Sequence, residues 1–260
     1  MLTNTLNVWT VADALVDYTL KRNPEMRTLN PVVGECNDGY LNDIAKRQVQ
    51  KAHVLAALEK ASESNVEEGC VGAGVGTQCF AWKGGIGTSS RQVEYEGHTY
   101  TLGVMTQTNT GRSRNLRIDG VPIGRELVPD YTKPKTPAGS IMFVVGTDAP
   151  LTSRQLTRVA RRAAFGLARV GAEAEHSSGD FVIAFSNGNR IDEKGHQSAS
   201  EFIAETQLNM FFRAAIDATE EAILNALFKA ETIVGRDGRT LAGIPIDKVK
   251  EIMHQYGRSA

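Results

Sequence analysis

The sequence predicts an α+β fold in which a mixed β-sheet sandwich is covered by helices. Helical patterns lie at both ends of each half of the 260-residue chain, and strand patterns lie between them. Only some of these strands follow a strand–helix–strand order, which argues against a doubly wound sheet. The length suits one large domain or two small ones.

The first quarter of the chain predicts two helices separated by a short extended segment. Residues 9–22 place Val11, Leu15 and Tyr18 at helical spacing, and Pro24 ends the pattern. Residues 31–35 are extended. A second helix is expected over residues 42–61, with one face made by Ala45, Val49, Ala52 and Ala56.

Glycine and β-forming residues dominate residues 68–110. We expect strands at 78–83, 86–95 and 100–107. Glu96-Gly97 is the expected hairpin turn between the last two, because turns of this kind require positive φ angles that glycine adopts readily.

A proline-rich linker is expected over residues 119–138, because proline lacks a backbone N–H and has a fixed φ. The apolar run Ile141 to Val145 follows it and predicts a short buried strand. Ser140 therefore lies where an exposed linker enters the core. It is either a strand-edge serine, or the Gly139-Ser140 bond is cut and Ser140 becomes an N-terminal residue carrying both a hydroxyl and an α-amine.

The last part of the chain predicts three helices and one more strand. Thr152 to Gln155 reads as a capping box, and Leu156, Val159, Ala163, Leu167 and Val170 form the inner face of the helix that it opens. Further elements are expected as a strand at 181–186, a polar loop at 187–199, a long helix at about 200–230 and a short helix at 246–256.

The composition gives no sign of a nucleic-acid or membrane partner. The net charge is −1, and hydrophobic and charged shares of 41% and 23% are ordinary for a globular protein. Three cysteines without a CxxC pair favour a reducing compartment. The sequence has no signal-peptide pattern and no apolar run as long as a membrane span, so we expect a cytoplasmic protein.

Nucleotide and metal sites are not predicted. The glycines at 72–76 do not have the GxGxxG spacing, and no phosphate-loop motif is present. The five histidines are scattered without metal-binding spacing, so we expect neither a metal nor a cofactor.

Three polar residues near strand ends are candidates for chemistry. Ser178 and Asp180 stand two residues apart at the start of a strand, where alternation points both side chains to the same side. They form either an ordinary turn or a polar pair that orients a nucleophile. Asn109 follows a strand and is either a turn residue or an amide that donates to an oxyanion.

Ten sequence blocks, taken in order, closely resemble the L-aminopeptidase/D-esterase (DmpA-like) family, which includes the β-peptidyl aminopeptidases. The blocks are LTNT (2–5), PVVGECNDGYLND (31–43), GCVGAGVGTQCFAWKGGIGTSSR (69–91), Asn109, GVPIG (120–124), GSIMFVVGTDAPL (139–151), RVARRAAFGLAR (158–169), SGDFVIAFS (178–186), AAIDATEEAILNAL (214–227) and GRDGRTLAGIP (235–245).

The resemblance implies one αββα sandwich over residues 1–260, similar in layout to the N-terminal nucleophile hydrolases. It implies a zymogen that cuts itself between Gly139 and Ser140 into an α fragment (1–139) and a β fragment (140–260). Substrates would be short peptides, amides or esters with a free N-terminus, and the assembly would be a homo-oligomer.

The resemblance also implies a role for each site residue. Ser140 would be the nucleophile, with its own α-amine as base, because an α-amine has a pKa of about 7.7–8.0. Asn109 matches the oxyanion asparagine, and Ser178 and Asp180 match residues that hydrogen-bond around the nucleophile. Asn37 stands where some members have a tyrosine, so we expect it to contact substrate with a different selectivity.

Two alternatives to this function stay open. Members carry a further N-terminal region before the LTNT block, so this chain is expected to be short relative to the family, and the first alternative is a non-catalytic or unprocessed remnant. The second is an acyltransferase of the ornithine acetyltransferase kind, which has a related layout but uses threonine as its nucleophile. Ser140 argues against it.

Overall fold

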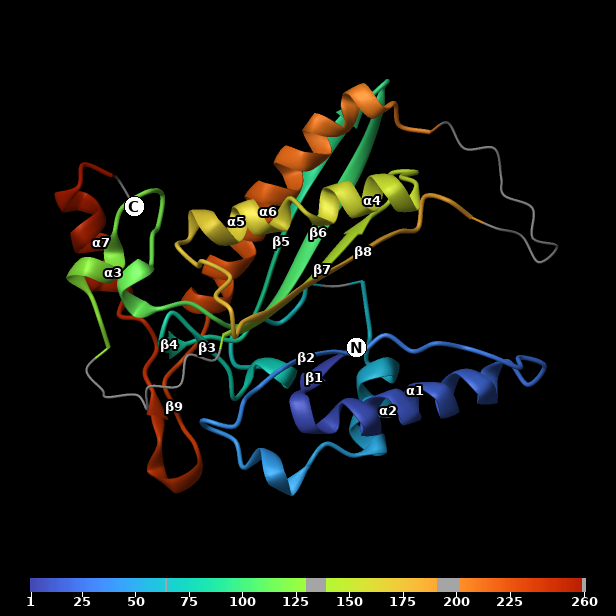
Figure 1. Cartoon of the computed structure of the whole chain (residues 1–260), viewed down its shortest axis with the longest axis horizontal. Coiled ribbons are helices and arrows are strands. Elements are labelled where there is room, and N and C mark those ends of the chain that lie inside the picture. The colour runs from blue at the N-terminus through green and yellow to red at the C-terminus, as the bar shows by residue number, and fades with distance from the viewer. Residues whose placement is uncertain (64, 130–138, 191–201, 259–260) are drawn as a thin grey trace.

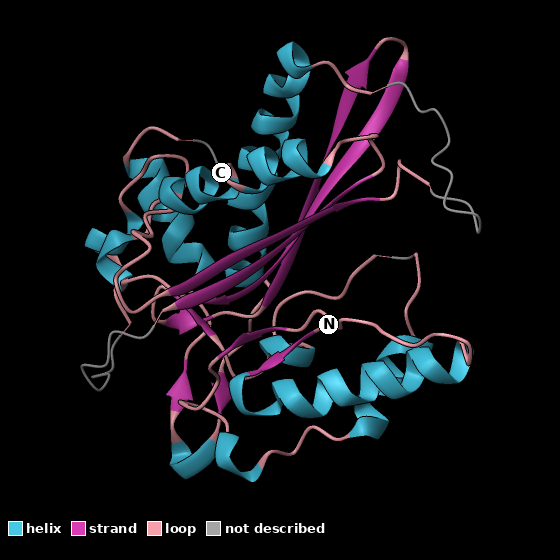
Figure 2. Ribbon diagram, turned by 45° about the vertical axis from the view of Figure 1, so that its right-hand side comes forward, coloured by secondary structure: helices cyan, strands magenta, loops and turns pink. Residues whose placement is uncertain are grey.

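The computed structural model describes residues 1–63, 65–129, 139–190 and 202–258. Four layers follow one another (Figure 1). Helices α4 (Ser153–Ala160), α5 (Ala163–Arg169) and α6 (Leu208–Phe228) cover a sheet of four strands, β5 (Ile86–Tyr95), β6 (His98–Asn109), β7 (Ser140–Thr147) and β8 (Gly179–Ser186). On the other face of this sheet lie β1 (Leu2–Asn4) and β2 (Gly34–Cys36). Helices α1 (Val8–Arg22) and α2 (Lys51–Glu59) form the outer layer on that side (Figure 2).

The four-stranded sheet is mixed, as the sequence predicts. Its order is β5-β6-β7-β8, with antiparallel pairing in the first two pairs and parallel pairing between β7 and β8. Figure 2 shows its strong twist. The hairpin between β5 and β6 turns at Glu96 and Gly97, which both have positive φ, at 47° and 80°. This confirms the turn predicted there.

The main core lies between this sheet and the helical layer. Ile141, Phe143 and Val145 alternate along β7 toward the helices and are at most 1% exposed. The capping box is present, because Thr152 accepts a hydrogen bond from the Gln155 backbone and the Gln155 side chain accepts one from the Thr152 backbone. The helix predicted after it is divided into α4 and α5. The long helix begins at Leu208, later than predicted, after a 3-10 turn at Glu205–Gln207.

The N-terminal layer departs most from the sequence prediction. Strands β1 and β2 are parallel, and α1 matches the expected helix. The sequence predicts a second helix from residue 42, but the chain there forms a short 3-10 turn, Ile44–Lys46, and α2 begins only at Lys51. Arg47 has φ 48°, a left-handed conformation that ends a helix. Val54, and not the exposed Ala52, is the buried residue of α2.

The glycine-rich segment folds tightly against the sheet. It contains a 3-10 turn, Gly72–Gly74, and two short antiparallel strands, β3 (Gln78–Cys79) and β4 (Trp82–Lys83). The single strand predicted at 78–83 is wrong, because Phe80 and Ala81 have positive φ and reverse the chain. Lys83 is fully buried, and its ammonium donates to the carbonyl oxygens of Gly74 and Thr77, each at 2.9 Å, and to that of Gly84.

The remaining elements lie at the edges of the molecule. They include the 3-10 turns Ser113–Asn115 and Arg236–Gly238, α3 (Ile123–Glu126), β9 (Ile233–Val234), β10 (Thr240–Leu241) and α7 (Ile246–Gln255). Helix α3 lies inside the region predicted as a linker, whose residues 130–138 are outside the described residues. Residues 191–199 of the predicted polar loop are also outside them. Among the described helices, none has the length and apolar character needed to cross a bilayer.

Candidate active site

Three strands bring the predicted site residues together at one edge of the sheet. Ser140, the first residue of β7, pairs with Asn109 at the end of β6 and with Gly179 at the start of β8. Ser140 is partly buried and Asn109 is only 6% exposed. The register therefore places a hydroxyl and a buried amide on directly opposed residues.

The peptide bond before Ser140 is held by the neighbouring strand. The Gly179 N–H donates a hydrogen bond of 3.1 Å to the Gly139 carbonyl oxygen. A Cβ atom added to Gly139 would lie 2.9 Å from the Ser178 hydroxyl oxygen and 3.4 Å from that of Thr110. Glycine is therefore the residue that fits between these two hydroxyls without displacing them.

Ser178, the residue just before β8, and Asp180, the second residue of β8, are hydrogen-bonded to each other, so their side chains lie on the same side, as alternation predicts. The Ser178 hydroxyl donates to Asp180 Oδ1 at 2.7 Å. Asp180 Oδ2 is buried and has no hydrogen-bond partner among the described residues. Burial raises the pKa of the Asp180 carboxyl above its usual range, and the bond from Ser178 opposes that rise. This carboxyl therefore has one oxygen free to accept a further proton donor.

An exposed ion pair joins the segments that carry Asn109 and Ser178. Arg112, just after β6, contacts Glu175 through two nitrogens, and one of these contacts measures 2.8 Å. The Ser178 N–H then donates to the Glu175 carbonyl oxygen at 2.7 Å. These bonds connect the end of β6 to the start of β8 just outside the site.

Cys36 lies beside Ser140 and is not among the site residues predicted from the sequence. The fully buried Cys36 thiol donates to the Gln107 carbonyl oxygen at 3.4 Å. Burial, followed by the charge of Glu35, raises the pKa of this thiol well above its usual range. The sequence signal that could have identified Cys36 is its position inside the block ECND, which is part of the family resemblance. Counting cysteines does not single it out.

Asn37, the predicted substrate contact, is exposed and takes part in a local turn. Its Oδ1 accepts a hydrogen bond of 2.9 Å from the Gly39 backbone. The role of Asn37 toward substrate therefore stays a prediction.

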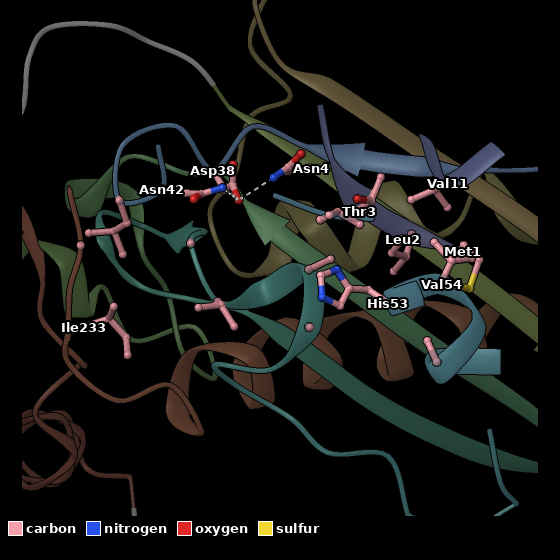
Figure 3. A pocket seen from close by; sticks show the side chains of 18 of the residues that line it. Met1, Leu2, Thr3, Asn4, Val11, Asp38, Asn42, His53, Val54 and Ile233 are labelled. Carbon is pink, nitrogen blue, oxygen red and sulfur yellow. Dashed lines mark hydrogen bonds between the residues drawn. The ribbon is translucent and has the colours of Figure 1, made fainter. Parts of the chain in front are cut away.

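A separate pocket of about 510 Å³ opens between the N-terminal layer and the glycine-rich segment (Figure 3). Asp38 lies in its wall, where Oδ2 accepts hydrogen bonds from Asn4 at 3.1 Å and from Asn42 at 2.9 Å. None of Ser140, Asn109, Ser178 and Asp180 lines this pocket. The pocket is therefore distinct from the strand edge that carries those residues.

The model of the family described as peptidase family S58 matches residues 1–241. The chain belongs to this family. S58 membership, together with the named aminopeptidase relatives, makes the chain a serine-type peptidase with aminopeptidase function.

Relatives and solved structures agree with the S58 assignment. The chain is 41% identical to the β-peptidyl aminopeptidase BapA of Sphingosinicella microcystinivorans, covering all of this chain and 70% of the relative. The chain also shares 44% sequence identity with the PH0078 protein of Pyrococcus horikoshii OT3, whose crystal structure superposes with a TM-score of 0.91. This match covers 99% of this chain and 72% of the Pyrococcus protein.

A third comparison identifies the fold. The L-aminopeptidase D-Ala-esterase/amidase of Ochrobactrum anthropi, a variant of the Ntn hydrolase fold, is 33% identical with a TM-score of 0.90. The match covers all of this chain and 74% of the Ochrobactrum protein. The predicted α+β fold with an Ntn-like layout is therefore confirmed.

Proposed function

We propose that this S58 peptidase is a self-processing aminopeptidase whose nucleophile is the N-terminal Ser140 released by cleavage of the Gly139-Ser140 bond. The observation that carries the proposal is the hydrogen bond from the Gly179 N–H to the Gly139 carbonyl oxygen. A backbone donor on this oxygen polarises the carbonyl and stabilises negative charge that develops there.

Self-cleavage would proceed by an N-to-O acyl shift. Ser140 Oγ attacks the Gly139 carbonyl carbon, the carbon–nitrogen bond breaks, and the released nitrogen takes up the hydroxyl proton. Water then hydrolyses the resulting ester, which yields a Gly139 carboxylate and a free Ser140 with its hydroxyl and α-amine. The Ser178 hydroxyl lies beside the α-carbon of Gly139, and we assign it the transfer of protons during these steps.

The freed α-amine would act as the base in substrate hydrolysis. Its ordinary pKa of about 7.7–8.0 leaves part of it neutral near pH 7, so it can accept the proton of Ser140 Oγ. Asp180 Oδ2, which has no partner among the described residues of the uncut chain, would accept a hydrogen bond from this amine. The Asn109 amide would donate to the oxyanion of the tetrahedral intermediate. These steps call on no metal or cofactor.

Substrates would be short peptides, amides or esters with a free N-terminus. Two relatives support this class: one is named a β-peptidyl aminopeptidase, and the other an L-aminopeptidase and D-Ala-esterase/amidase. A cytoplasmic location and a homo-oligomeric assembly remain expectations, and light scattering of the purified protein tests the second.

Intact mass spectrometry of the purified chain beside Ser140→Ala tests the proposal. We expect two fragments, one beginning at Ser140, in the wild type and a single chain in the variant. An aminoacyl-p-nitroanilide should be hydrolysed only by the wild type. A single uncut chain in both samples, without hydrolysis, would contradict the proposal and favour the remnant.

A further inference from the structure

The turn between β3 and β4 contains two residues in an unfavourable backbone conformation. Cys79 pairs with Trp82, so Phe80 and Ala81 are the two central residues of this hairpin. Both have positive φ, at 51° and 68°. Turns with positive φ at both central positions usually contain asparagine or aspartate followed by glycine, because other side chains are strained there. Strain of this kind persists only where the surrounding structure imposes it.

The contacts of Phe80 show what the turn holds. The Phe80 N–H donates a hydrogen bond of 2.7 Å to the Thr110 carbonyl oxygen, and Cys79 forms a parallel bridge with the same residue. The Phe80 side chain is 0% exposed. A Cβ atom added to Gly111 would lie 2.5 Å from Cδ1 of Phe80, so the ring packs directly against the Gly111 backbone. The strained turn therefore directs both a backbone donor and a ring to the segment that follows Asn109.

This segment begins where the sheet no longer holds β6. The pairing of β6 with β5 stops at Gln107, and its pairing with β7 stops at Asn109, opposite Ser140. Thr110 is the next residue, and its carbonyl oxygen bonds to the hairpin turn. Asn109 thus lies between two anchors, which are its own pairing with Ser140 and the bond from Phe80 to its neighbour.

We propose that Phe80 is a positioning residue that fixes the end of β6 and thereby the Asn109 amide. The inference rests on the proposed function, in which Asn109 donates to the oxyanion. A donor that is held in place stabilises the developing charge without first reorienting, and a small displacement of it costs a large factor in rate. Because this role acts on the transition state, losing it should lower kcat and leave KM nearly unchanged.

Two pairs of variants test the contact from both sides. Phe80→Leu removes the ring and keeps the backbone N–H, and Phe211→Leu is its control, because Phe211 is also 0% exposed but lies in α6. Gly111→Ala places a Cβ atom against the ring. Gly120→Ala is its control, because Gly120 has a similar φ of 77° and an added Cβ there has no atom within 4 Å. The Gly111 pair decides the question if Phe80→Leu does not fold.

We expect Phe80→Leu and Gly111→Ala to lower kcat by at least about tenfold with little change in KM. Phe211→Leu and Gly120→Ala should keep the kcat of the wild type. Steady-state hydrolysis of an aminoacyl-p-nitroanilide by cleaved enzyme, at a temperature below every melting transition, measures this. A merely structural role would lower the melting temperatures of Phe80→Leu and Phe211→Leu alike and leave kcat unchanged, which would overturn the inference.

A double-mutant cycle tests whether Phe80 acts through Asn109. Asn109→Ala removes the donor that Phe80 is proposed to position. In that background Phe80→Leu should lower kcat by less than about threefold, because residues that act through one another are not additive. An equal loss in both backgrounds would mean that Phe80 acts on another group and would overturn the inference.

The two proposals fail in different ways. If the wild type is active and both Phe80→Leu and Gly111→Ala match it in kcat, the positioning role is overturned and the proposed function stands. If the wild type neither cleaves itself nor hydrolyses substrate, the proposed function fails and the role of Phe80 fails with it.

Discussion

The Gly179 N–H donates a hydrogen bond of 3.1 Å to the carbonyl oxygen of Gly139, across the start of the parallel strands β7 and β8. The bond that we propose to be cut is thus fixed by the pairing of two central elements. The residues around this carbonyl and in the neighbouring core suggest four tests.

Gly139→Ala should slow self-cleavage. The added Cβ would lie 2.9 Å from Ser178 Oγ, so either that hydroxyl or the Gly139 carbonyl must move. We expect the half-life of the uncut chain to rise at least about tenfold, because small displacements of reacting groups cost large factors in rate. Time-resolved intact mass measures this.

Gly103→Ala is the control, because an added Cβ there has no atom within 4 Å and the residue lies in the same sheet. Equal cleavage rates in Gly139→Ala and Gly103→Ala would show that the contact with Ser178 does not matter.

Asn109→Ala should lower kcat by about 10²–10³-fold with little change in KM, because a lost oxyanion donor acts only in the transition state. Asn115→Ala, a few residues downstream in the same segment, is the control. The measurement is steady-state hydrolysis of an aminoacyl-p-nitroanilide by cleaved enzyme. A change confined to KM would instead assign Asn109 to substrate binding.

Asp180→Asn should stabilise the uncut chain at neutral pH. The pKa of the folded carboxyl is raised by burial, so at a pH between the unfolded and the folded pKa the folded state binds more protons than the unfolded state. The stability cost is absent below the unfolded pKa of about 4 and grows as pH rises from there. The comparison is made in a Ser140→Ala background, where no free α-amine can pair with Asp180.

We expect the Asp180→Asn variant to melt at a higher temperature than its Ser140→Ala parent at pH 7. Near a pH of about 3 the two melting temperatures should be equal, because the Asp180 carboxyl is then protonated in both the folded and the unfolded state. Glu25→Gln, at an exposed position, should show no such difference. A lower melting temperature for Asp180→Asn at neutral pH would mean that the ionised carboxyl stabilises the uncut fold.

Lys83→Met should destabilise the protein without touching the site. Its ammonium donates to the carbonyl oxygens of Gly74, Thr77 and Gly84, which would then be buried without a donor. We expect a loss of about 3 kcal/mol or more in the free energy of unfolding. Urea denaturation beside the exposed Lys60→Met measures it. Equal midpoints would mean that water replaces the ammonium.

Local sequence signals predicted those elements whose cause is local. The turn at Glu96-Gly97 and the capping box at Thr152 and Gln155 depend on residues at most three positions apart, and both are present. Two predicted elements, the helix from residue 42 and the strand at 78–83, are interrupted by residues with left-handed backbone conformations. The left-handed Arg47 ends the expected second helix, and Phe80-Ala81 reverses the expected strand. Arginine, phenylalanine and alanine do not favour positive φ, so the residue types at these positions do not predict the bends.

The candidate site divides in the same way. The sequence by itself determined that Ser178 and Asp180 share one side of a strand, since alternation is a property of any strand. It also placed Ser140 at the point where an apolar strand begins. Only the tertiary structure decided that Asn109 and Gly179 pair with Ser140 and that the Cys36 thiol donates to the Gln107 carbonyl oxygen. Those contacts depend on strand register and on the stacking of two sheets, which residues far apart in the chain determine together.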